Sequence, residues 1–118
     1  MRLDLEKLKL DLRKFARARA WEKFHSPKNL SMALAVEASE LLERFQWLTE
    51  EQSRNLDAEE LRAIKEEIAD VQIYLVRLAD KVGVNIGDAV RSKMRLNHSR
   101  YPENRVRGNA RKYSDYKK

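Results

Sequence analysis

Apolar residues recur every three or four positions over most of the chain, a spacing that places them on one face of a helix. The pattern predicts an all-α fold of four helices, over residues of about 3–20, 27–47, 58–82 and 86–101. Ser26 before Pro27, and Asn85, are typical of helix starts, whereas Gly83 is typical of the left-handed residue that ends a helix. Residues 49–56 are polar and aperiodic, so we expect them to form a connection.

The third predicted helix carries two apolar lines. Its main stripe is expected to pack inside the chain and comprises Leu61, Ile64, Ile68, Val71, Leu75, Leu78 and Val82. A second line, formed by Ala69, Ile73 and Val76, lies on the side away from this stripe, where a helix facing water would not need it. Since four helices can cover only one side of the third helix, we expect the second line to meet another subunit of a homo-oligomer. The alternative is a loop or the C-terminal arm folded over this line.

The composition fits a single globular domain. The 118 residues are 42% hydrophobic and 37% charged, with only 3 Gly and 2 Pro for the many turns of a β protein. The absence of Cys excludes disulfides, thiolate zinc sites, iron–sulfur clusters and cysteine nucleophiles. No uncharged run approaches the roughly 20 residues that cross a bilayer. We expect a cytoplasmic protein without a membrane contact, with an all-α domain over 1–102 and a basic, extended C-terminal arm over 103–118.

The net charge of +6 is unevenly distributed along the chain. Residues 36–70 are strongly acidic, whereas the segments before and after them are basic. An acidic centre between basic flanks suggests a site that handles cations and anions together. Two other interpretations stay open: exposed helices that simply mix charges, and a basic helical module whose C-terminal arm binds nucleic acid.

Four acidic residues form two acid-x-x-acid steps on consecutive predicted helices: Glu37 with Glu40, and Glu67 with Asp70. Residues three apart project from one helix face, and both steps flank an apolar stripe. If the stripes pack together, the carboxylates meet at one margin of the core, where their repulsion requires a cation. Oxygen ligands without His or Cys select a hard ion, so we expect Mg²⁺, with Mn²⁺ as a substitute. The alternative is a set of surface charges, solvated or paired with nearby basic residues.

The fourth predicted helix carries Lys93 and Asn97 on its inward face, and Arg100 follows on nearly the same side. A lysine opposite a carboxylate-bound cation is an arrangement that binds polyphosphate, because positive charges then contact its oxygens from both sides. Trp21 and Trp47 bracket the second helix, and either offers a flat surface to a base. The structural alternatives are a lysine that extends to solvent and tryptophans that anchor a core or an interface.

Residues around the acidic steps narrow the chemistry further. A di-iron bundle would use similar scaffolding, but its Glu-x-x-His steps are missing, since His25 and His98 lie outside the interior of both acidic helices. Tyr74 follows Asp70 by one turn on the same side of its helix, where its hydroxyl either reaches the site or covers the core.

Together these residues resemble the MazG-like superfamily of all-α nucleoside triphosphate pyrophosphohydrolases, and most closely its small dCTP pyrophosphatase branch. The similarity covers about residues 8–115. The acid-x-x-acid steps are typical of the whole superfamily, whereas the two tryptophans and the segment after Lys93 are typical of the branch. The motifs that carry the similarity are Trp21-Glu22-x-Phe24-His25-x-Pro27-x-Asn29-Leu30, Phe45-Gln46-Trp47, Glu66-Glu67-x-x-Asp70-Val71-x-Ile73-Tyr74-Leu75, Ser92-Lys93-Met94, Asn97, Arg100-Tyr101-Pro102 and Arg111-Lys112-Tyr113.

The resemblance implies a four-helix bundle completed by oligomerisation, as a homotetramer built from a dimer of dimers. It implies Mg²⁺-dependent hydrolysis of a nucleoside triphosphate, dCTP or a modified pyrimidine deoxynucleotide, to the monophosphate and pyrophosphate. The metal ligands and catalytic residues would be Glu37, Glu40, Glu67 and Asp70. The residues that bind the nucleotide would be Trp21, His25, Trp47, Tyr74, Lys93, Asn97 and Arg100. A related pyrophosphohydrolase acting on phosphoribosyl-ATP, or a dUTPase, stays an enzymatic alternative.

Overall fold

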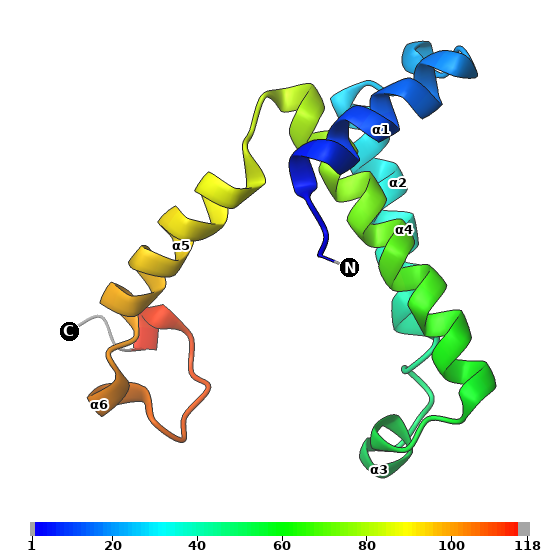
Figure 1. Ribbon diagram of the computed structural model, residues 1–118. Helices are drawn as coiled ribbons and strands as arrows, with labels where there is room; N and C mark the ends of the chain where they lie inside the picture. Colours follow the sequence, from blue (N-terminus) through cyan, green and yellow to red (C-terminus); the bar gives the residue numbers. More distant parts are fainter. Residues whose placement is uncertain (1, 116–118) are drawn as a thin grey trace. The chain divides into compact units, whose positions relative to one another are not determined.

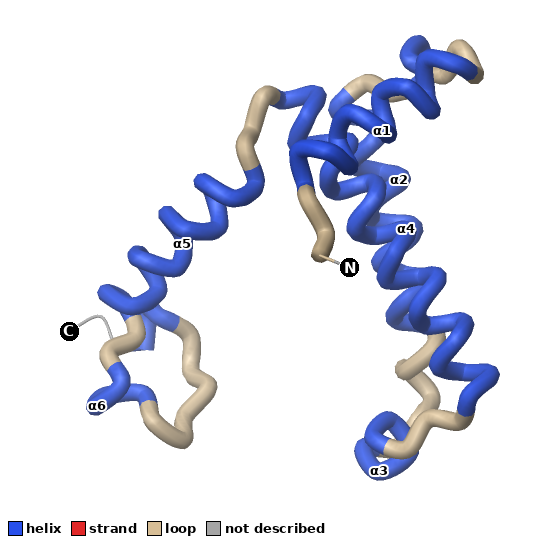
Figure 2. The backbone as a smooth tube through the Cα atoms, in the orientation of Figure 1, coloured by secondary structure: helices blue, strands red, loops and turns tan. Residues whose placement is uncertain are grey.

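The computed structural model describes residues 2–115, and within that range it contains only helices, turns and loops (Figure 1, Figure 2). The helices are α1 (Leu5–Ala18), η1 (Glu22–Phe24), α2 (Pro27–Glu43), α3 (Glu50–Arg54), α4 (Ala58–Val82), α5 (Ile86–Arg100), α6 (Glu103–Val106) and η2 (Tyr113–Asp115), where η marks a 3₁₀ helix. The predicted all-α class is confirmed. The chain groups into two compact units, residues 1–84 and 85–118. None of the helices in the described range has the length and apolar character needed to cross a bilayer.

Short-range signals set the main helix boundaries where the sequence predicts them. The side chains of Ser26, Asp57 and Asn85 each accept a hydrogen bond from the backbone amide three residues later. Each bond satisfies one of the donors that the first turn of a helix leaves free. Gly83 ends α4 with φ 73°, in the left-handed region that favours a residue without Cβ. The start of α2, both ends of α4 and the start of α5 therefore follow from local chemistry.

The region after α2 differs from the sequence-based expectation. α2 ends at Glu43 and not near residue 47, because residues 44–47 form turns. The amides of residues 44–46 donate to the carbonyls of Leu41 and Leu42 in the last turn of α2. The expected connection over 49–56 contains the short helix α3. Thr49 and Gln52 form a capping box there, in which each side chain accepts a hydrogen bond from the other residue's amide.

The end of α1 also differs, since the helix stops at Ala18 instead of near residue 20. Ala20 adopts φ 54°, and its amide donates to the Arg17 carbonyl at 3.1 Å. The amide of Trp21 donates to the Ala16 carbonyl at 2.9 Å, which completes a Schellman helix end. This reversal carries the chain from α1 into η1 and fixes the backbone of Trp21.

In the first unit, α2 runs antiparallel to α4, and α1 packs against the C-terminal part of α4 (Figure 1). The buried apolar side chains are few for a unit of this length. They are Ala16, Leu30, Ile64, Val76 and Ala79. Because so little apolar surface is enclosed, a single chain leaves much of its apolar surface uncovered.

The two apolar lines of α4 are buried differently from the prediction. The main stripe was expected inside the chain, but four of its members remain 39–53% exposed, namely Leu61, Ile68, Leu75 and Val82. Val76 of the second line is buried within the chain, whereas Ile73 is 36% exposed. Ile64 of the main stripe is buried, and Glu37 on α2 lies against Glu67 and Asp70, so the contact with α2 includes the flank of α4 that carries these acids.

In the second unit, η2 lies against the end of α5. The Tyr113 ring meets the Tyr101 ring edge-on, with 6.1 Å between centroids, and the Arg100 guanidinium lies 4.8 Å from the centroid of Tyr113. The expectation of an extended arm is therefore wrong for residues 103–115, because these ring contacts tie the arm to the helix before it. Residues 116–118 of the predicted arm lie outside the described residues, and the domain boundary at residue 102 stays a prediction.

Candidate functional site

Three carboxylates from two helices meet in the first unit. Glu37 on α2, and Glu67 and Asp70 on α4, each offer an oxygen atom, and these three atoms lie within 4.8 Å of one another. The contact of α2 with α4 thus brings Glu37 of the first acid-x-x-acid step to both acids of the second step. We call Glu37, Glu67 and Asp70 the carboxylate trio.

Glu40, the second acid of the α2 step, is half-buried one turn after Glu37. It offers no oxygen to the close group of three atoms. Glu40 nevertheless acts on the trio. After burial, its hydrogen bonding and its charge are the main causes of the raised pKa values of Glu37 and Glu67. Glu40 therefore lies next to the trio and raises the pKa values of two of its members.

The trio is costly to keep ionised. Glu37 Oε2 and Glu67 Oε2 are buried, and neither accepts a hydrogen bond from any residue that the structure describes. Burial, and then Glu40, raises the pKa of Glu37 to about 7. Burial, Glu40 and Asp70 also raise the pKa of Glu67, and Arg44 opposes that shift. The site therefore favours neutralisation, by a proton or by a bound cation.

The donor set of the trio fits a hard divalent cation. All three groups are carboxylate oxygens, the donors that Mg²⁺, Mn²⁺ and Ca²⁺ prefer, whereas zinc sites favour nitrogen and sulfur. The buried Oε2 atoms of Glu37 and Glu67 accept no hydrogen bond from any described residue. A cation in contact with them would supply a partner.

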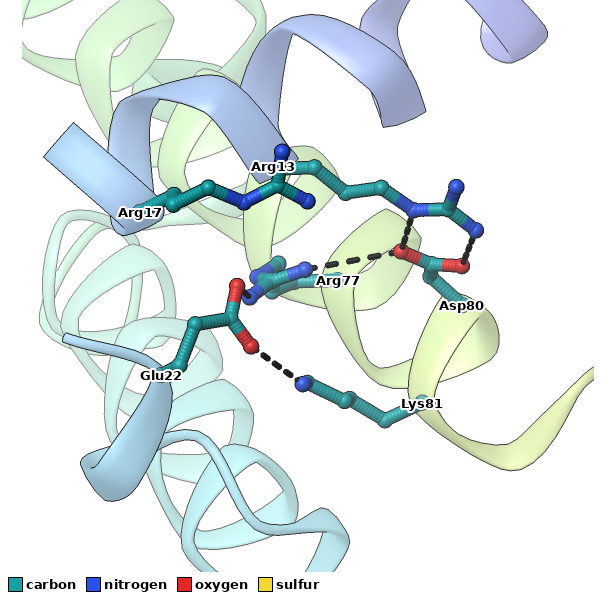
Figure 3. Close-up of a pocket in the computed structure, with 6 residues that line it drawn as sticks. All are labelled: Arg13, Arg17, Glu22, Arg77, Asp80 and Lys81. Carbon is teal, nitrogen blue, oxygen red and sulfur yellow. Dashed lines mark hydrogen bonds and ion pairs between the residues drawn. The ribbon is translucent and has the colours of Figure 1, made fainter. Parts of the chain in front are cut away.

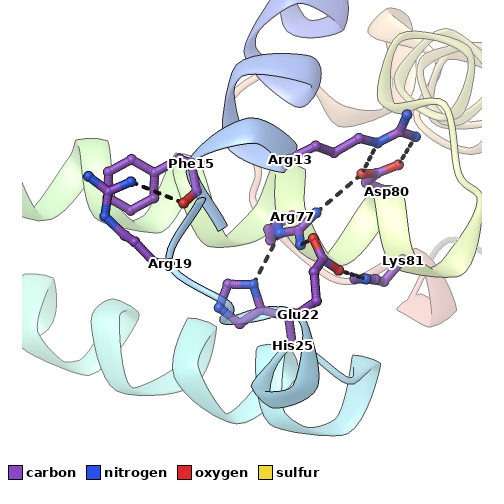
Figure 4. A network of polar contacts seen from close by, with 8 residues as sticks. All are labelled: Arg13, Phe15, Arg19, Glu22, His25, Arg77, Asp80 and Lys81. Atoms are coloured by element: carbon purple, nitrogen blue, oxygen red, sulfur yellow. Dashed lines mark hydrogen bonds and ion pairs between the residues drawn. The ribbon is translucent and has the colours of Figure 1, made fainter. Parts of the chain in front are cut away.

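An aromatic cluster lies before the start of α2, in the same unit as the trio, and Figure 4 shows two of its members, Phe15 and His25. Trp21 meets Phe15 and His25 edge-on, with centroid distances of 5.7 and 6.4 Å. The Arg19 guanidinium stacks 3.5 Å from the centroid of Phe15. Phe15 and His25 contact the Trp21 side chain, yet this residue is 43% exposed and therefore accessible to a ligand.

Trp47, the second predicted base-binding tryptophan, lies beyond the opposite end of α2 and is 85% exposed. The 17 residues of α2 separate it from Trp21 by about 25 Å along the helix axis. One chain therefore does not bring both tryptophans to one pocket.

Three further predicted substrate residues, Lys93, Asn97 and Arg100, lie on α5 in the second unit. Lys93 is exposed, whereas Asn97 and Arg100 are half-buried. Their spacing of four and three residues places them on one face of the helix. The proximity of this face to the carboxylates stays a prediction.

The sequence pattern did not predict the ion-pair network at the C-terminal part of α4 (Figure 3). Arg77, only 3% exposed, donates to Glu22 Oε1 at 2.6 Å and to Asp80 Oδ2 at 3.4 Å. Arg13 holds Asp80 with two hydrogen bonds of 2.8 and 2.6 Å, and Lys81 pairs with Glu22. Hydrogen bonds from Arg13 lower the pKa of Asp80, and one from Lys81 lowers that of Glu22. These residues line a pocket of about 470 Å³.

A polar row along α4 was the signal that could have revealed this network. At steps of three and four residues, the row contains Glu67, Asp70, Tyr74, Arg77 and Lys81. It begins at the carboxylates, passes the half-buried Tyr74 and reaches the buried Arg77. Polar residues at this spacing occupy one flank of the helix, and here that flank joins the carboxylates to the ion-pair network.

The chain is thus an all-helical protein in which the antiparallel helices α2 and α4 bring together carboxylates from both acid-x-x-acid steps. Residues 32–116 match the MazG-like family. The chain belongs to this family.

Similar proteins include named pyrophosphatases. Mouse dCTP pyrophosphatase 1 is 48% identical over 103 residues, and human dCTP pyrophosphatase 1 is 45% identical over the same length. Each match covers 86% of this chain and 61% of the relative, so the chain spans less than two thirds of these proteins. The crystal structure of a pyrophosphatase from Archaeoglobus fulgidus is similar with a TM-score of 0.79 and 39% identity, over 86% of this chain and 95% of that one.

Proposed function

We propose that the protein is a Mg²⁺-dependent nucleoside triphosphate pyrophosphohydrolase, in which Mn²⁺ can replace Mg²⁺. The observation that carries the proposal is the carboxylate trio with its two buried, unpartnered oxygens. The names of the mouse and human relatives support dCTP, or a modified pyrimidine deoxynucleotide, as the substrate. The products would be the nucleoside monophosphate and pyrophosphate.

The trio would hold the metal ion in this reaction, with Glu40 beside it. Bound Mg²⁺ would neutralise the carboxylates and polarise the oxygens of the phosphoryl group under attack. A carboxylate of this group accepts a proton from the attacking water, whose oxygen forms a bond to the α-phosphorus. The bond from the α-phosphorus to the bridging oxygen breaks, and pyrophosphate leaves with that oxygen. Lys93, with Arg100 as a second candidate, would stabilise the charge of the phosphates.

The spacing along α4 supports a nucleotide that lies lengthwise on the polar row. Asp70 and Arg77 are seven residues apart, which is about 10 Å along the helix. Arg77 contacts His25, and the exposed Trp21 ring lies next to His25. A nucleotide whose base lies on Trp21 would thus direct its phosphates toward the trio, with Tyr74 beside its sugar.

We also propose that the active form is a homo-oligomer, specifically a tetramer. The exposed members of the main apolar stripe of α4 offer a surface for a second copy of the chain. Met32 and Val36 on α2, which are 50% and 55% exposed, add to this apolar surface. Trp47, too far from Trp21 in one chain, could then serve a site completed by a partner. Light scattering on the purified protein should give a mass of about four times 13.9 kDa. A monomer at micromolar concentration would refute this assembly.

Product analysis tests the proposed reaction. The protein is incubated with Mg²⁺ and a panel of canonical and modified deoxynucleoside triphosphates, including dCTP and dUTP, together with phosphoribosyl-ATP. We expect pyrophosphate as the first inorganic product. The rate should be highest with a pyrimidine nucleotide, and EDTA should abolish turnover. Orthophosphate as the first product would contradict attack at the α-phosphorus. A preference for dUTP or phosphoribosyl-ATP would instead support the alternative enzymes.

A further inference from the structure

His25 makes one hydrogen bond that limits where its own proton can be. Arg77 Nε donates to His25 Nδ1 at 3.2 Å. A guanidinium stays protonated throughout the accessible pH range and has no acceptor, so Nδ1 must be the acceptor of this bond. A neutral His25 that keeps the bond therefore carries its proton on Nε2.

Arg77 is held so that it cannot easily turn away from His25. Besides His25, it binds Glu22 at 2.6 Å and Asp80 at 3.4 Å, so all three guanidinium nitrogens are engaged. Asp80 is in turn fixed by Arg13. With a side chain that is 4% exposed, Arg77 is a rigid, permanently charged donor.

The second ring nitrogen of His25 is directed away from Arg77 (Figure 4). Among the described residues, none forms a hydrogen bond with this Nε2 atom. The neighbouring Trp21 ring is 43% exposed and meets the imidazole edge-on. A flat ligand stacked on Trp21 would therefore find the Nε2–H group of His25 at its edge.

We propose that Arg77 is a positioning residue that holds His25 as a neutral imidazole with its proton on Nε2, so that His25 donates a hydrogen bond to a nucleobase stacked on Trp21. This inference rests on the proposed function for the identity of the ligand. The base must offer a lone pair at that edge, either a carbonyl oxygen or an unprotonated ring nitrogen. An amino group at the same position would meet donor against donor.

The charges around His25 agree with a neutral ring. Burial lowers the pKa of His25, and the positive charges of Arg77 and Lys81 on α4 lower it further. Glu22 on η1 acts in the opposite direction. His25 is thus expected to stay neutral at a pH at which an ordinary histidine begins to gain a proton.

Nitrogen NMR on protein labelled with ¹⁵N-histidine tests the proposal directly. The chain has only two histidines, so a His98→Gln variant identifies the His25 signals. In the wild-type protein we expect the cross-peak pattern of the Nε2–H tautomer and a titration midpoint below about 6.5. A proton on Nδ1, or a midpoint at or above that value, would overturn the proposal without any Arg77 variant.

Variants then assign the effect to Arg77. Arg77→Met should raise the midpoint of His25 and mix its tautomers, whereas Arg17→Met, in the same pocket, should change neither. If both variants give the same titration midpoint and the same tautomer pattern for His25, Arg77 has no positioning role. Should Arg77→Met not fold, the wild-type spectrum still decides.

Addition of dCMP, a product of the proposed reaction, tests the ligand. We expect the Nε2 resonance to move and the bond at Nδ1 to persist. If the tautomer is as expected but no nucleotide moves Nε2, the donor role is wrong while the positioning by Arg77 stands. Loss of the proposed reaction in the product analysis would leave the tautomer of the free protein unaffected, so the two failures can be distinguished.

Discussion

Glu67→Gln and Asp70→Asn should each lower kcat for nucleotide hydrolysis by at least about 100-fold. Each substitution replaces one carboxylate of the trio with a neutral amide of nearly the same shape. An amide oxygen binds a hard cation less strongly than a carboxylate, and it cannot accept a proton from water. Steady-state assays of pyrophosphate release at saturating Mg²⁺ measure the effect.

Glu59→Gln is the matched control for Glu67→Gln. Glu59 is exposed in the first turn of α4, on the same helix but two turns before the trio. Its replacement should leave kcat within about twofold. Thermal unfolding in EDTA separates a chemical effect from misfolding, because Glu67→Gln removes one of the crowded charges and should raise Tm. Near-normal turnover for Glu67→Gln and Asp70→Asn would refute the site.

Metal-free protein should lose thermal stability as the pH rises from about 5 to about 8. Glu37 has a folded-state pKa raised from 4.5 to about 7, chiefly by burial. Its protonated form is therefore favoured in the folded protein, and that advantage is lost as the pH rises through about 7. Glu67 shifts in the same direction. Asp80 and Glu22, whose pKa values are lowered, act in a more acidic range. The lowered pKa of His25 acts in the opposite direction below about pH 6.5, and we expect Glu37 and Glu67 together to outweigh it.

Mg²⁺ should reverse this loss, because the ligands must release their protons to bind it. We expect the rise in Tm on addition of Mg²⁺ to be larger at about pH 8 than at about pH 5. Glu37→Gln should flatten the pH dependence in EDTA and reduce the effect of Mg²⁺. Differential scanning calorimetry with and without EDTA gives both quantities. An equal gain from Mg²⁺ at both pH values would contradict the coupling of proton and metal.

Local signals made the helix boundaries predictable. Ser26, Asp57, Asn85 and Gly83 act within a few residues of their own position, so their effect can be inferred without knowledge of the fold. The start of α3 could have been predicted in the same way, since Thr49-x-x-Gln52 has the form of a capping box.

Tertiary features were harder to infer. The convergence of Glu37 with Glu67 depends on how α2 is rotated against α4, and the same rotation leaves Ile68 exposed. The periodicity of one helix does not specify which flank its neighbour covers. The burial of Arg77 arises from partners up to 55 residues away, so only the polar spacing along α4 pointed to it.

The most direct test of the carboxylate site is a titration with Mn²⁺, followed by electron paramagnetic resonance of the free ion. We expect saturable binding to the wild-type protein and to Glu59→Gln, and loss of that binding in Glu67→Gln. Excess Mg²⁺ should displace the bound Mn²⁺ from the wild-type protein. Equal Mn²⁺ binding by all three proteins would contradict a cation site formed by Glu37, Glu67 and Asp70.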